Sequence, residues 1–321
     1  MLRQILIGIV TLSIMFTIGC DSDDKKEVVD ESITMNTEDI GIDSYYFNLN
    51  NGSFSETYDL KFEAAGQGYQ IVLNNAAGVY AMEADTNDFD AAIVPSSPFS
   101  SDTADASIYV IGENWMDENT YDPSDHSIDG NGTIYFVRTA NYEIVKLEVI
   151  SGSPTSFIIK YAIESDTDIF GDAVTKTINY SSSSPEYFDF TGESEITDSN
   201  WDVAILTMPV YAPGMGNIYM PTIKMNFGRN VKVSVLTDTA YEEITEVPSD
   251  IILVMDSAVN SHLGYEGVNE VLVYHPEPPY NHKVIVENPD YIYIFETPEG
   301  SFKLKFDEYG SGALIFTYVM L

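Results

Sequence analysis

The 321 residues include 14 Lys and Arg against 51 Asp and Glu, which gives a formal net charge of −37 at pH 7. A surface of this sign repels phosphate polymers, so nucleic acid is not an expected partner. Apolar residues make up 44% of the chain and aromatic residues 12%, and this composition excludes a globally disordered protein.

The chain begins with a segment that is typical of a secretion signal. Arg3 precedes an apolar run from Ile5 to Ile18, which is too short to span a membrane stably. The run ends in Gly19 and Cys20, the only cysteine, and this ending resembles the lipobox of bacterial lipoproteins. We therefore predict a lipoprotein signal peptide over residues 1–19, lipid on Cys20, and attachment to the outer membrane or the cell surface. An ordinary secretory signal with an incidental cysteine is the alternative.

A polar stretch follows the cysteine. Residues 20–42 show no sustained periodicity, and we predict a flexible tether there. Because Cys20 would carry lipid, no disulfide can form, and the fold has to be stabilised by packing alone.

A repeated pattern organises the rest of the chain. Residues 187–205 read YFDFTGESEITDSNWDVAI, and residues 46–62 read YFNLNNGSFSETYDLKF. A second pair of segments also matches, IYFVRTANYEIVKLEV at 134–149 and IYIFETPEGSFKLKF at 292–306. We predict two tandem domains, residues 43–165 and 184–321, joined by a linker over residues 166–183.

Short runs of aromatic and β-branched residues, separated by Gly or Asn, indicate strands. In the first repeat these runs are Tyr45–Leu49, Tyr58–Glu63, Tyr69–Leu73 and Val79–Met82. No stretch shows a helical period, so the predicted fold class is all-β with antiparallel sheets. The acidic loop Asp85–Asp90 resembles a calcium site in its oxygen content, but it lacks the usual spacing and closing Glu, and a solvated turn is the preferred interpretation.

The second repeat contains a segment rich in sulfur. Residues 208–225 read MPVYAPGMGNIYMPTIKM and hold four of the 11 Met together with three Pro and two Gly. Because Pro cannot donate a backbone hydrogen bond, we interpret this segment as an extended loop rather than as strands. A loop this apolar either covers a core or contacts a ligand, so we expect any binding site to lie in the second repeat.

Three of the four His also lie in the second repeat, at His262, His275 and His282. When the repeats are aligned on their IYF and IYI strands, His282 falls close to the position of His126. This repeated His is interpreted either as a ligand or as a turn residue whose hydrogen bonds are satisfied.

Four segments together resemble the HmuY family of haem-binding lipoproteins of Bacteroidota. They are the YF…TG…WD pattern at 187–203, its variant at 46–62, the run YQIVLNNAAGVYAMEADTNDFDAAI at 69–93, and IYIFETPEGSFKLKFDEY from residue 292 onward. The resemblance covers most of both repeats. It implies an all-β fold, exposure at the cell surface, and capture of haem for hand-over to an outer-membrane receptor of the TonB-dependent type.

The resemblance also implies a flat apolar cleft, one or two axial ligands to the iron from His or Met, and neighbours for the haem propionates. Family members are expected to hold the iron between two His or between two Met. The candidate ligands in this chain are Met215, Met220, His275 and His282, and the candidate propionate partners are Arg229 and Lys224.

Catalytic motifs are missing from the sequence. It contains no G-x-S-x-G, no H-E-x-x-H and no phosphate-binding glycine loop, and we do not expect an enzyme. The alternative function is a non-haem structural or adhesive surface lipoprotein that binds a protein or glycan partner, which the acidity and the scarcity of basic residues favour. Asp-Ser/Thr-Ala triplets at Asp102, Asp238 and Asp256 resemble bacterial O-glycosylation sites.

Overall fold

The computed structural model describes residues 32–65, 68–103, 108–181, 185–192, 194–196, 200–257 and 260–321. In these ranges the chain consists of strands and turns, and the helical segments are 3-10 turns of three residues each. These turns are η1 (Asn75–Ala77), η2 (Glu118–Thr120), η3 (Phe227–Arg229) and η4 (Tyr241–Glu243). The predicted all-β class is confirmed. The predicted signal peptide, Cys20 and tether residues 21–31 lie outside the described residues.

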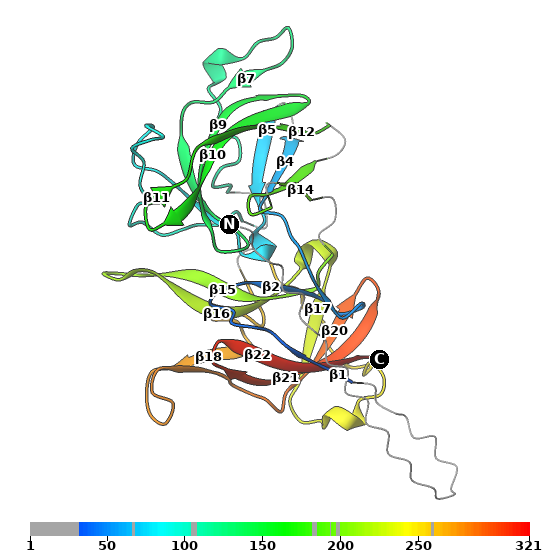
Figure 1. The fold of residues 1–321 in the computed structure, drawn as a ribbon. Helices are drawn as coiled ribbons and strands as arrows, with labels where there is room; N and C mark the ends of the chain where they lie inside the picture. Colours follow the sequence, from blue (N-terminus) through cyan, green and yellow to red (C-terminus); the bar gives the residue numbers. More distant parts are fainter. Residues whose placement is uncertain are drawn as a thin grey trace, which may run out of the picture. The chain divides into compact units, whose positions relative to one another are not determined.

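One continuous part of the chain builds the largest sheet (Figure 1). Its strands are β6 (Tyr80–Glu83), β7 (Ile128–Asp129), β8 (Ile134–Arg138), β9 (Ile144–Ser153), β10 (Ser156–Asp166), β11 (Ile169–Phe170) and β12 (Val174–Asn179). The order is β11-β10-β9-β8-β6, and β12 pairs with β10 while β7 pairs with β9. The prediction of a linker over residues 166–183 is wrong for residues 166–179, which belong to this sheet, because β11 and β12 both pair with β10 and Ile178 is fully buried.

A five-stranded sheet contains the last strands of the chain. It has the order β1-β22-β21-β20-β17, with β1 (Ile33–Asn36), β17 (Lys232–Leu236), β20 (Ile292–Thr297), β21 (Gly300–Gly310) and β22 (Ala313–Met320). A separate hairpin pairs β18 (Leu272–His275) with β19 (Lys283–Val286). The predicted tether is corrected from residue 32 onward, because β1 pairs with β22 and the side chains of Met35 and Ile40 are buried in the core.

The opening hairpin of each repeat pairs with the other repeat. The sheet β16-β15-β2-β3 joins β2 (Tyr45–Asn48) and β3 (Ser53–Ser55) to β15 (Val203–Ala212) and β16 (Gly216–Met225). The sheet β14-β13-β4-β5 joins β4 (Leu60–Ala65) and β5 (Gly68–Leu73) to β13 (Glu186–Asp189) and β14 (Ser194–Glu195). Both exchanged pairings are antiparallel, and their registers match when the repeats are aligned.

A buried aspartate fixes each exchanged hairpin. The backbone N–H of Phe190 donates to Asp59 Oδ2 at 2.8 Å, and the backbone N–H of Leu49 donates to Asp202 Oδ2 at 2.9 Å. Both carboxyl groups are fully buried. The YD and WD pairs that reveal the repeat in the sequence thus place a hydrogen-bond acceptor against the opening hairpin of the other repeat.

The exchange mixes the cores. One core, built mainly from the first repeat, also contains Phe188 and Phe190, while the core of the second repeat contains Phe47 and Leu49. Residues 32–321 form one compact unit. The two predicted domains therefore describe the repeat in the sequence, but their boundaries do not separate the two cores.

In two of the three Asp-Ser/Thr-Ala triplets, the aspartate has the same structural role in both repeats. Asp102 accepts hydrogen bonds from the backbone N–H groups of Leu73 and Val110, and Asp256 makes the matching pair of bonds in the second repeat. Both aspartates are buried, and each ties a loop to the end of a strand, whereas Asp238 is exposed.

Candidate functional site

A tyrosine–histidine pair occurs at the corresponding place in both repeats. The hydroxyl of Tyr121 lies 2.5 Å from His126 Nδ1, and the hydroxyl of Tyr274 lies 2.6 Å from His282 Nδ1. The backbone φ is 61° at His126 and 63° at His282, so both residues adopt the left-handed turn conformation. The predicted equivalence of the two His therefore appears in the local geometry, and both are turn residues with one ring nitrogen engaged.

His275 ends β18 and is engaged differently. Its Nε2 lies 2.7 Å from a carboxylate oxygen of Glu287, and its ring centroid is 4.9 Å from that of Tyr280. In the hairpin register His275 lies opposite Lys283, whose side chain is exposed. One end of this hairpin thus carries two His rings, two Tyr rings and a cation.

The segment 208–225 is not a loop, which corrects the prediction. Residues from Val203 to Met225 form the hairpin β15–β16 with an unbroken register, in which Pro209 lies opposite Tyr219 and Pro221 opposite Thr207. β16 is an edge strand, and only the first residues of β15 pair with β2, so the missing proline N–H groups leave no gap in a central sheet.

The hairpin β15–β16 exposes apolar side chains near its turn. Met215 is 74% exposed, and Tyr211, Ile218 and Tyr219 are also exposed. Met220 is half-buried and lies opposite Met208 in the register. The thioethers proposed as ligands are therefore placed differently, one in the turn and one along the strand.

The loop that precedes β18 is hydrogen-bonded to β16. The hydroxyl of Ser261 donates to the carbonyl of Ile223 in β16, and the backbone N–H of Tyr265 donates to the hydroxyl of Thr222. β16 also contacts β18 directly. The structure thus brings together the strand that carries Met220 and the strand that carries His275.

The two basic residues proposed for propionates have internal partners. The ammonium group of Lys224 is buried and donates to the backbone carbonyl and side-chain oxygen of Asn75, at 2.5 and 3.1 Å. Burial lowers the pKa of Lys224 to about 8. Arg229 contacts Asp202 at 3.4 Å and Glu299 at 2.6 Å. In this conformation, neither group offers an exposed cation that is not already paired.

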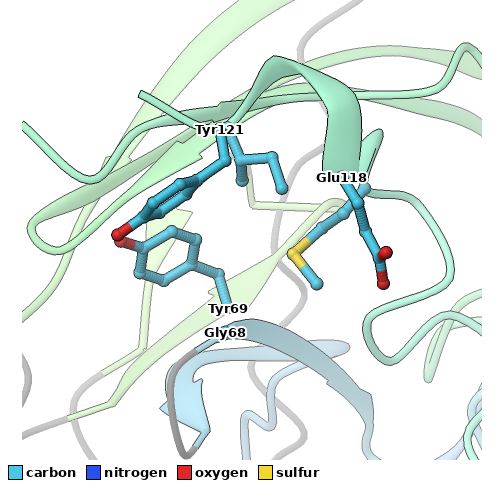
Figure 2. A pocket seen from close by; sticks show the side chains of 6 residues that line it. Gly68, Tyr69, Glu118 and Tyr121 are labelled. Carbon is cyan, nitrogen blue, oxygen red and sulfur yellow. The ribbon is translucent and has the colours of Figure 1, made fainter. Parts of the chain in front are cut away.

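The first repeat contains a pocket beside its tyrosine–histidine pair. The cavity measures about 340 Å³ and is lined by Gly68, Tyr69, Met116, Glu118, Tyr121 and Ile128 (Figure 2). The sequence patterns indicate a binding site in the second repeat, and they did not lead us to predict this cavity in the first. The repeated His126 is the sequence feature that could have indicated this site, because the hydroxyl groups of Tyr69 and Tyr121 are both hydrogen-bonded to this residue.

The acidic loop Asp85–Asp90 is a capped turn. The carboxylate of Asp88 accepts the backbone N–H groups of Asp90 and Ala91, at 3.1 and 3.3 Å. Among the residues that the structure describes, no group of three or more His, Cys, Asp or Glu side chains is placed to hold a metal ion. In the same part of the chain, no helix has the length and hydropathy that a membrane span requires.

Neither the protein-family models nor the curated proteins nor the solved structures contain a match to this chain.

Proposed function

We propose that this chain is a lipid-anchored surface protein that binds haem at the two hairpins of its second repeat and delivers it to an outer-membrane receptor. The observation that carries the proposal is the state of His282, whose Nδ1 is engaged by Tyr274 while its ring is exposed. With Nδ1 protonated and donating to the tyrosine oxygen, Nε2 keeps its lone pair for iron.

The two hairpins together supply residue types that suit a planar apolar guest. Imidazole nitrogen and thioether sulfur are both ligands of haem iron, and Met215 supplies an exposed thioether on the neighbouring hairpin. Tyr211 and Tyr219 add exposed aromatic surface for the macrocycle. Because Lys224 and Arg229 are engaged internally, Lys283 is the better partner for a propionate in the described structure.

Titration with haemin tests the proposal. We expect purified protein to give a Soret shift that saturates at one equivalent, and His282→Ala combined with Met215→Leu to weaken binding about tenfold or more, since an axial ligand is lost. His126→Ala removes the matching His of the first repeat and serves as the control, which should bind normally. A spectrum that stays that of free haemin, or equal losses in both variants, would refute this site.

The lipid anchor is tested separately. Cys20→Ala should move the protein from the membrane fraction to the soluble fraction without changing haemin binding. An unchanged membrane fraction would count against the anchor and leave the haem proposal standing.

The exposed apolar side chains of the hairpin β15–β16 also favour a second candidate, a surface module that binds a protein or glycan partner without haem. A contiguous exposed apolar patch often marks an interaction site. Capture of one defined partner by protein that shows no Soret shift, with loss of capture in Tyr219→Ser, would select this function over the first.

A further inference from the structure

The pocket of the first repeat has walls of aromatic, thioether and aliphatic side chains. Tyr69 and Tyr121 line one end, Met116 and Ile128 contribute apolar surface, and Glu118 adds a single carboxylate (Figure 2). Its volume of about 340 Å³ is at the lower end of the range for small-molecule sites.

The two tyrosine rings are held in place by the same residue. The hydroxyl of Tyr69 donates to the backbone carbonyl of His126 at 2.5 Å, and the hydroxyl of Tyr121 meets Nδ1 of the same histidine. Behind them, the indole N–H of the fully buried Trp115 donates to the carbonyl of Tyr69. Because both hydroxyl groups are engaged, the tyrosines offer ring surface to a ligand, mainly from Tyr121, which is 46% exposed, since Tyr69 is only 6% exposed.

The lining of the pocket carries a carboxylate, Glu118, and the chain around it in sequence is acidic. The sequence contains no Lys or Arg from Phe62 to Val137, and the segment that forms much of the pocket wall carries the acidic residues Glu113, Asp117, Glu118, Asp122, Asp125 and Asp129. A carboxylate in the lining, within a segment that carries no Lys or Arg, favours a cation and disfavours an anion.

We propose that this pocket binds a small organic cation through an alkylated ammonium group. Aromatic ring faces together with a carboxylate are the groups that recognise quaternary ammonium ions, through cation–π attraction and charge. The thioether of Met116 and the side chain of Ile128 provide surface for the alkyl groups. This site is distinct from the haem site of the second repeat and does not depend on it.

Choline and its neutral isostere 3,3-dimethylbutan-1-ol provide the first test, by titration calorimetry on the purified protein. Choline should bind, and the neutral isostere should bind about fivefold more weakly or worse, since only the cation gains cation–π attraction. Equal binding of the two probes, or no binding of choline at concentrations of tens of millimolar, would overturn the proposal.

Variants test which groups recognise the probe. Tyr121→Phe keeps the ring and should keep choline binding within about twofold, whereas Tyr121→Leu should weaken it about fivefold. Glu118→Lys, at an exposed position, reverses one charge and should abolish binding at low salt. Equal losses in the Phe and Leu variants, or full binding in Glu118→Lys, would show that ring and charge are not the recognition elements. Melting temperatures identify a variant that has lost its fold, and His282→Ala, which leaves this pocket intact, should bind choline normally.

Discussion

The buried carboxyl group of Asp59 should make the stability of this protein depend on pH in an unusual direction. Complete burial, together with the nearby carboxylates Asp189 and Glu143, raises the pKa of Asp59 to about 8, although the backbone N–H groups of Ala140 and Phe190 partly offset this rise. In the unfolded chain the same group has its ordinary value of 3.8. Between these two values the folded protein holds a proton that the unfolded chain has released.

The sign follows from this difference in bound protons. The stabilising contribution of Asp59 to the free energy of unfolding is fully present below a pH of about 4 and is lost as the pH rises through about 8. In this range the unfolded chain binds fewer protons than the folded protein, so raising the pH favours unfolding. The free energy of unfolding should decrease by up to about 1.4 kcal/mol for each pH unit in this window. Asp59→Asn cannot ionise, so this part of the slope should disappear.

Chemical denaturation of the two proteins at a series of pH values from 4 to 9, followed by tryptophan fluorescence, measures the difference. The wild-type protein should lose stability relative to Asp59→Asn as the pH rises, and the gap should stop growing above about pH 8. Asp238→Asn, at an exposed position, provides the control and should run parallel to the wild type. Parallel profiles for wild type and Asp59→Asn would refute the argument, since they would show that Asp59 is ionised in the folded protein at every pH tested.

Four further substitutions test the packing between the repeats, and the free energy of unfolding is measured for each. Phe47→Ala empties a fully buried site in the core of the second repeat and should cost about 3–5 kcal/mol. Phe54→Ala, on the partly exposed strand β3, should cost about 1 kcal/mol. Similar losses in the two variants would argue against the exchanged pairing of β2. Gly78→Ala places a side chain at φ 73° and should cost about 1–2 kcal/mol, so an unchanged stability would mean that this turn has another conformation. Lys224→Met removes both hydrogen bonds to Asn75 and should cost about 1–3 kcal/mol, and a more stable variant would show that burying the ammonium outweighs them.

The strands were predictable because their signal is local. Alternating buried residues in β9 and β10, and the apolar residues of β4 and β5, fit a half-buried sheet wherever these strands pair. The strands within residues 208–225 were not predicted because Pro209 in β15 and Pro221 in β16 count against a central strand, and the sequence alone does not show that β16 lies at an edge.

The exchange of hairpins could not be predicted from the repeat. Phe47 and Phe188 occupy equivalent places in nearly the same local sequence, so either could pair within its own repeat or with the other. The partner of Lys224 could not be predicted for the same reason. Its ammonium group donates to Asn75, which lies far away in the chain, and no local sequence pattern indicates that contact. His282 was recognised as a repeated residue, but its tyrosine partner was not.

The reciprocal pairing of the opening hairpins has a consequence for biogenesis. When the first repeat has emerged from the ribosome, its sheet still lacks β13, and the core built mainly from this repeat lacks Phe188 and Phe190. Its own hairpin, β2–β3, has no partner until β15 follows, and β1 waits for β22 at the end of the chain. Folding therefore has to be delayed until synthesis is nearly complete, and a single cut between the repeats in the folded protein would leave two fragments that remain paired through their exchanged hairpins rather than two separate domains.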